Sequence, residues 1–155
     1  MTKMLVLGLC AVLLTACARE GAGAPATAAP RDPAPSFSQD ADLVEEFAGV
    51  TLPASTGDLQ VGQLEGGIDD LLLARFSVDG GDLDAFVADA GFTGAPEPGR
   101  RVFSDDLGVG VPGWDVADAQ EVLGHDENVD GFARQVVIDV DDPARPVVYL
   151  RAFET

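Results

Sequence analysis

Apolar and polar residues alternate along four segments of the chain, and this period of two predicts four β-strands. The first two segments, 59–65 and 68–78, flank Gly66-Gly67, a pair typical of a two-residue hairpin turn. That turn places Val61 opposite Leu72, so that paired residue numbers sum to 133. Because the turn and the alternation agree on which side chains share a face, we expect an antiparallel hairpin.

The last two alternating segments, 132–140 and 148–152, predict a second hairpin. They are joined by 141–146, whose two prolines cannot donate to a strand ladder and therefore suit a connection. Two further segments, 40–48 and 82–90, repeat apolar residues every three to four positions, which predicts helices. The expected caps and stops are Ser38 or Asp40 and then Gly49 for the first helix, and Asp79 and then Gly91 for the second.

Residues 93–131 are rich in Gly, Pro and Asp and give a weak pattern, with a short strand at 101–103 and a helical turn within 116–123. The resulting order, α-β-β-α, an irregular stretch and β-β, is typical of an α+β domain. We therefore expect a two-layer fold, in which helices pack on one face of a mainly antiparallel sheet made of two hairpins.

The opposite face of the expected sheet is not polar, although an antiparallel sheet normally presents one polar face to water. Arg75 and Arg151 lie on it among six apolar residues, namely Leu71, Leu73, Val137, Val147, Tyr149 and Phe153. Either 93–131 covers this face or a partner does. We expect internal cover, and the six residues are the candidate interaction face.

The first seventeen residues differ from the rest of the chain. Lys3 precedes the apolar run 4–14, which as a helix rises about 16 Å, roughly half the hydrocarbon thickness of a bilayer. Leu14-Thr15-Ala16-Cys17 follows. This segment resembles the lipobox signal peptide of bacterial lipoproteins. The resemblance implies cleavage before Cys17, lipid on Cys17 and attachment to the outer side of the cell membrane; the alternative is an ordinary signal peptide with a cysteine at its cleavage site.

We accordingly expect three parts: a signal peptide at 1–16, a lipidated cysteine with an Ala- and Pro-rich tether at 17–37, and one globular domain at 38–155. The prolines of the tether favour extended chain at about 3.1 Å per residue. Cys10 and Cys17 are the only cysteines, so the domain contains no disulfide, no thiolate metal site and no cysteine nucleophile.

The formal net charge is −18, and it becomes −19 once Lys3 is removed, because eight arginines then stand against 27 acidic residues. Such a chain repels nucleic acid and anionic lipid headgroups. We therefore expect no nucleic-acid partner, and attachment to the membrane only through the lipid on Cys17. The acidic residues are spread along the sequence, which is typical of a solvated surface.

Residues that carry catalysis or bind metals give weak signals. His125 is the only histidine, no serine lies in a G-x-S-x-G context, and we expect His125 in an exposed loop. Asp126-x-Asn128-x-Asp130-Gly131 resembles the opening of an EF-hand calcium loop, but Val137 stands where that family has a bidentate glutamate. We expect neither a metal nor a cofactor, and Trp114 as a core anchor.

The leading hypothesis is a membrane-anchored lipoprotein of the cell envelope, whose domain is a non-catalytic binding or interaction module for an envelope protein or small ligand. Two alternatives stay open, an envelope hydrolase that uses carboxylates of 93–131 and a purely structural lipoprotein. A carboxyl group with a raised pKa in a cleft favours the hydrolase. An uncovered apolar sheet face favours the binding module.

Overall fold

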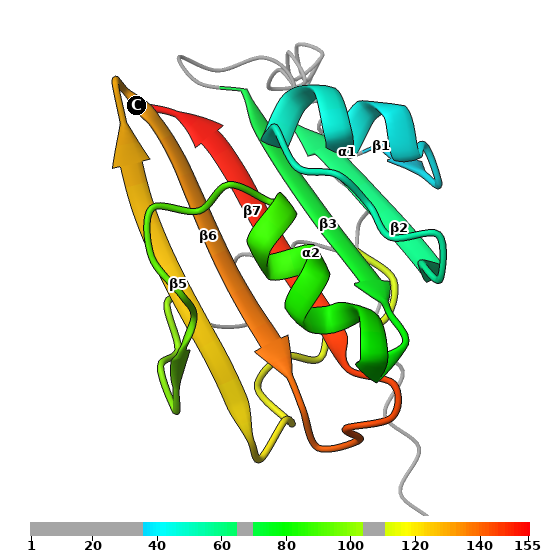
Figure 1. Cartoon of the computed structure of the whole chain (residues 1–155). Coiled ribbons are helices and arrows are strands. Elements are labelled where there is room, and N and C mark those ends of the chain that lie inside the picture. The colour runs from blue at the N-terminus through cyan, green and yellow to red at the C-terminus, as the bar shows by residue number, and fades with distance from the viewer. Residues whose placement is uncertain (1–35, 65–69, 104–110) are drawn as a thin grey trace, which may run out of the picture. The chain divides into compact units, whose positions relative to one another are not determined.

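The computed structural model describes residues 36–64, 70–103 and 111–155 (Figure 1). The expected signal peptide, Cys17 and the tether up to residue 35 lie outside the described residues, and so do Gly66 and Gly67 of the expected hairpin turn. Within the described ranges, no helix is both long enough and apolar enough to cross a membrane.

The described chain forms one antiparallel sheet of seven strands in the order β1-β2-β3-β7-β6-β5-β4. The strands are β1 (Ser36–Ser38), β2 (Gly57–Leu64), β3 (Leu71–Ser77), β4 (Glu97–Pro98), β5 (Val122–Val129), β6 (Phe132–Asp139) and β7 (Val147–Glu154). The α+β class and the antiparallel sheet are therefore confirmed. The observed sheet is larger than the expected sheet of two hairpins, because β1 extends it on one side and β5 and β4 extend it on the other. The sheet also begins at Ser36, two residues before the expected start of the domain.

The ladder between β3 and β7 joins the two expected hairpins. Leu71 pairs with Phe153 and Ser77 with Val147, so the last strand of the chain lies in the middle of the sheet. Ser36 pairs with Gln63 near the end of β2, and Leu64 pairs with Leu71. The start of β1 and the end of β7 consequently lie at the same end of the sheet.

The register of β2 against β3 differs from the expected one. Val61 pairs with Ala74 and Gln63 with Leu72, so paired numbers sum to 135 and not to 133. Because the pleat repeats every two residues, this slip of two leaves Val61 and Leu72 on the same face. The sequence therefore predicted the face of each side chain correctly and its partner wrongly.

β5 is the strand that the sequence analysis missed. It pairs along its whole length with β6, and only Asp130 and Gly131 lie between the two strands, with φ of 53° and 86°. Positive φ at both central residues is typical of the type I′ hairpin turn, which favours Asp-Gly. Two expectations for the preceding stretch were wrong: 101–103 forms no strand, and the helical turn within 116–123 is only a turn at 116–118 before β5 begins.

The two helices match their expected positions closely. α1 (Ala41–Ala48) begins after Asp40, whose carboxylate accepts a hydrogen bond from the Leu43 N–H, and it stops at Gly49 with φ 64°. α2 (Leu83–Asp89) follows a short 3-10 turn, η1 (Gly80–Asp82). Asp79 does not cap this turn through its side chain, because its carboxylate pairs with Arg145 at 3.0 Å instead.

Two clusters of buried side chains lie against the sheet. The larger one joins both helices to the strands, with both helices on the near side of the sheet in Figure 1. It contains, among others, Val44, Ala48, Leu72, Phe76, Phe86, Val136, Ile138 and Leu150. The smaller one contains Phe103, Val116, Ala119, Val122, Val137 and Tyr149. Val136 and Val137 are neighbours on β6 and enter different clusters, so the clusters occupy opposite faces, which we call the helix face and the strap face.

Candidate functional site

Arg134 is the central polar residue of the helix face. It lies on β6 with 13 % of its side chain exposed. Its Nη1 donates to the carbonyl oxygens of Ala48 at 3.2 Å and Ala90 at 2.9 Å, and its Nη2 donates to Gly91 at 2.9 Å. These carbonyls end α1 and α2, where backbone acceptors lack helical partners and the helix dipole is negative. One guanidinium group therefore caps the C-termini of both helices.

Glu127 on β5 pairs with Arg134 across the ladder, and only 3 % of its side chain is exposed. Arg134 Nε lies 2.6 Å from Glu127 Oε1, and the Thr93 backbone N–H donates to Oε2 at 2.6 Å. Burial alone would raise the pKa of Glu127, but the hydrogen bonds from Thr93 and Arg134 outweigh it and lower the pKa. This carboxylate stays ionised, which disfavours a role as a general acid.

His125 is buried on β5, so the expectation of an exposed loop histidine was wrong. Its Nε2 lies 3.4 Å from Thr93 Oγ1 and 3.5 Å from Glu127 Oε2, and its ring packs against Phe92. A nucleophile–histidine–carboxylate device needs the two partners on different ring nitrogens. Here both contacts involve the same nitrogen, so the cluster fastens residues 92 and 93 to the sheet and does not activate Thr93.

A groove of about 400 Å³ borders this cluster. It is lined by Glu46, Phe47, Ala48, Gly49, Gly91, Thr93, Glu127, Val129, Phe132 and Arg134. Among its charged groups, Glu127 and Arg134 bind each other, and Arg134 also binds the helix ends. These two groups therefore already have internal partners.

The strap face is crossed by residues 111–121, which we call the strap. Trp114 of the strap packs edge-on against Tyr149 of β7 with ring centroids 5.3 Å apart, and it stacks on Phe103 at 5.6 Å. The Tyr149 hydroxyl donates to Asp115 Oδ1. Burial raises the pKa of Tyr149, and the bond to Asp115 raises it further, so the phenol stays protonated.

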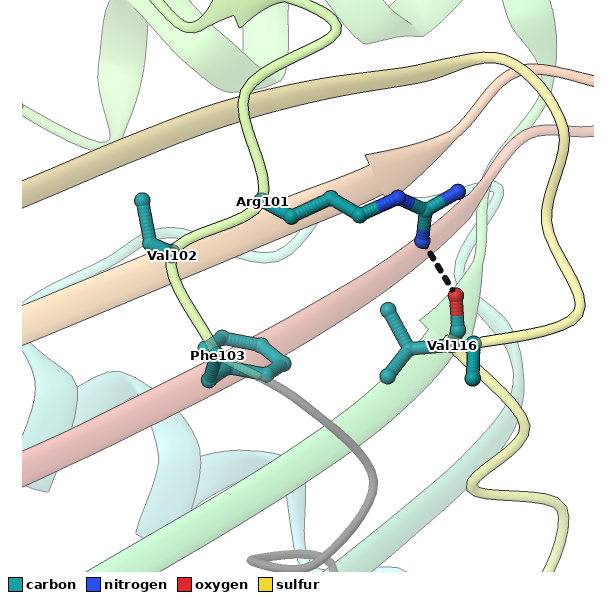
Figure 2. Close-up of a pocket in the computed structure, with 5 residues that line it drawn as sticks. Arg101, Val102, Phe103 and Val116 are labelled. Atoms are coloured by element: carbon teal, nitrogen blue, oxygen red, sulfur yellow. Dashed lines mark hydrogen bonds between the residues drawn. The ribbon is translucent and has the colours of Figure 1, made fainter.

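Two further contacts fasten the strap at its C-terminal half. Arg101 Nη1 donates to the Val116 carbonyl at 2.9 Å (Figure 2). Arg101 Nη2 donates to the Ala119 carbonyl. The Asp141 carboxylate accepts from the backbone N–H groups of Gln120 and Glu121 at 2.8 and 2.6 Å, and these bonds lower its pKa. A pocket of about 510 Å³ lies beside these contacts, lined by Arg101, Val102, Phe103, Val116 and Ala117.

The strap accounts for part of the candidate interaction face. Leu73, Val137 and Tyr149 are buried, the latter two within the cluster that Phe103, Val116, Ala119 and Val122 complete. Residues of 93–131 therefore cover this half of the face. The other three residues, Leu71, Val147 and Phe153, are half-buried, and Arg151 lies 4.5 Å above the ring of Phe153.

Three of the described carboxylates of 93–131 lie in different parts of the domain. Glu127 binds Arg134 on the helix face, Asp115 binds Tyr149 on the strap face, and Asp126 pairs with Arg100 at the edge of the sheet. Asn128 of the EF-hand-like motif lies on β5 and donates to Thr155 Oγ1 at 3.1 Å. Across the described ranges, no group of three or more His, Cys, Asp or Glu side chains is placed to hold a metal ion.

Sequence reasoning missed Arg134 and Glu127 as a pair, because β5 was not recognised. The Asp130-Gly131 dipeptide before an alternating strand was the available signal for that hairpin. Comparisons of the chain with protein-family models, with curated proteins and with solved structures gave no significant match.

Proposed function

We propose that the protein is a lipid-anchored protein of the bacterial cell envelope, attached through Cys17 to the outer side of the membrane. The observation that carries the proposal is Leu14-Thr15-Ala16-Cys17 directly after the apolar run 4–14. The acidic balance supports lipid attachment over surface adsorption, because anionic headgroups repel such a domain. One acyl chain gives only marginal attachment, so the lipobox resemblance matters because it implies more than one.

The test is Cys17→Ser in the full chain, expressed in a bacterial host that is fed an alkyne-tagged fatty acid. We expect the wild-type chain to carry the tag and to shift to the mature size, and Cys17→Ser to lose both properties. Cys10→Ser, a cysteine substitution in the same segment, is the matched control and keeps both. Tag on the Cys17→Ser chain, or none on the wild type, contradicts the proposal.

A second version of the chain separates lipid attachment from surface binding. It places residues 18–155 behind a signal peptide without a lipobox, so that the exported domain carries no lipid. We expect this version to stay in the soluble fraction at high salt. Sedimentation with membranes would mean that a surface of the domain binds an envelope component, and that the lipid is not the only anchor.

We further propose that the domain is a non-catalytic binding module for an envelope partner, built as a two-layer scaffold whose helices cover one face of the sheet. In support, His125 has both polar contacts on one nitrogen, and the carboxylates Glu127 and Asp115 are each bound internally. The part of the strap face that the described residues leave accessible offers the contact surface, with Leu71 and Phe153 half-buried and Phe37 44 % exposed.

Photo-crosslinking in cells tests this surface. A photoreactive amino acid at Phe153 is expected to give a discrete adduct with one envelope protein. The same amino acid at Ala88, an exposed position on α2, is the control and is expected to give none. Equal adducts at both positions, or none at Phe153, would remove the support for an interaction face.

A further inference from the structure

The outer edge of β5 is covered by β4 over only part of its length. β4 pairs with two of the eight residues of β5, and the β5 arrow in Figure 1 extends well past β4. The Gly99 N–H donates to the Val122 carbonyl, so the backbone groups of Val122 and of every second residue after it point away from β6. Asp126 and Asn128 follow in that alternation, and none of the described residues bonds their outward N–H and C=O groups.

The chain before β4 passes over the helix face of β5 and does not lengthen β4. The Thr93 N–H binds the Glu127 carboxylate at 2.6 Å. Gly94 lies over the His125 ring, where a Cβ would approach Cε1 to 3.0 Å. This loop therefore lies above β5 and not beside it. The edge of β5 beyond β4 is left open to the described chain, and an open strand edge is a template for pairing with another chain.

The groove of about 400 Å³ on the helix face borders the same stretch of β5. Glu127 and Val129 of β5 line it, and Val129 is 47 % exposed. The side chains of a strand added to β5 would alternate between the two faces of the sheet, so that every second one lies beside Val129 and the groove. Backbone bonds to a strand edge, combined with a pocket for alternate side chains, are how sheet edges bind extended peptides.

We propose that this edge of β5 binds an extended segment of another protein, with apolar side chains toward the groove and basic side chains toward Asp126. Glu46, Glu97 and Asp130 are exposed around the site, and the whole chain carries a formal charge of −18. Opposite charges on facing positions of neighbouring strands stabilise the pair, and like charges destabilise it. A second copy of this acidic chain is therefore a poor occupant. Arg100 already pairs with Asp126, but this pair is exposed and exchanges readily for another cation.

Two eight-residue peptides of the same composition test the proposal, which depends neither on the lipid anchor nor on the strap face. In one peptide arginine and valine alternate. In the other, four arginines precede four valines, so that a strand of it has no apolar face. Fluorescence anisotropy with the full chain is expected to show binding at least tenfold tighter for the alternating peptide. Equal affinities would overturn the proposal, because attraction by net charge alone explains them.

Asn128→Pro places the binding site on the β5 edge. Proline removes the outward N–H of residue 128 and spares the ladder to β6, which uses the alternate residues. The affinity for the alternating peptide is expected to fall about tenfold, in keeping with one lost hydrogen bond. Asn128→Ala removes the same side chain and keeps the N–H, so this control variant is expected to retain the affinity. Equal affinities of the two variants would overturn the proposal.

Hydrogen exchange followed by mass spectrometry on the full wild-type chain gives a measurement that needs no substitution. With the alternating peptide at saturation, the outward amides of Asp126 and Asn128 are expected to exchange at least tenfold more slowly, because they then donate to the peptide. The amides of β7, in the middle of the sheet, are expected to keep their rates. No slowing in the fragment that covers 125–129 would overturn the proposal, even where the peptide binds elsewhere on the chain.

Discussion

The two faces of the sheet are covered in opposite ways, and on each face a polar side chain from the sheet binds the cover. On the helix face, Arg134 of β6 reaches carbonyl groups that the helices cannot bond themselves. On the strap face, Tyr149 of β7 bonds a carboxylate of an irregular segment. Helices satisfy their own backbone and need help only at their ends. The irregular cover is bound by side chains as well, from Tyr149 to Asp115, from Arg101 to two carbonyl groups and from Asp141 to two backbone N–H groups.

Arg134→Leu is expected to have the largest effect on stability. It leaves Glu127 buried without its cation and removes the cap of both helices, and breaking one partner of a buried pair costs about 3–5 kcal/mol. Urea unfolding of the purified protein measures it. Arg145→Leu breaks the exposed pair with Asp79 and is the control, with an expected loss of about 0–1 kcal/mol. Similar losses for both variants would mean that the helix face does not depend on Arg134.

The pair Val136→Ala and Val137→Ala compares the two faces directly. Both valines are fully buried on the same strand, and the same atoms are removed. We expect a loss of about 2 kcal/mol for Val136→Ala and about half of that for Val137→Ala, because an irregular cover collapses into a new cavity more readily than packed helices do. Equal losses in urea unfolding would show that the strap packs as rigidly as the helices.

Lowering the pH should lower the free energy of unfolding, because Glu127 on the helix face becomes protonated. Its pKa is lowered in the folded protein, so its contribution to stability is present above the unfolded pKa of about 4.3 and is lost as pH falls through the folded value. We expect Glu127→Gln to flatten the fall of stability below about pH 4.5, measured by urea unfolding between pH 7 and pH 3. Glu154→Gln at an exposed carboxylate is the control. An unchanged slope in Glu127→Gln would contradict the assigned bonds.

The smallest effect is expected from added calcium, which we expect not to bind to the domain. The EF-hand-like residues lie on β5 and in a hairpin turn, Asp126 pairs with Arg100, and Val137 occupies the position of the required glutamate. Isothermal titration calorimetry with calcium should show no binding in the micromolar range. Micromolar binding that Asp126→Ala abolishes would prove this prediction wrong.

The sequence predicted elements wherever the periodicity was local. α1 begins after Asp40 and ends at Gly49, as expected. In the β2–β3 hairpin, the predicted face of the side chains was correct, although the predicted register was not. β5 could not be recognised by alternation, because its inward side chains include His125 and Glu127, which are buried polar residues. The burial of Glu127 is made tolerable by Arg134, whose own contact with Ala48 spans 86 positions. Partners so distant leave no periodic signal. The sequence did predict that residues of 93–131 cover the strap face, but it did not predict which contacts hold them there.

The shared end of the sheet has a practical consequence for labelling. β1 begins and β7 ends at that end, so a fluorophore placed after Thr155 stays near Ser36, where β1 begins. A fluorophore in the connection 140–146 lies at the opposite end, about 26 Å away along the eight residues of β7. Labels at these two positions mark the two ends of the sheet. Given the proposed lipid anchor, energy transfer from each position to a dye in the bilayer would report how the domain is oriented relative to the membrane.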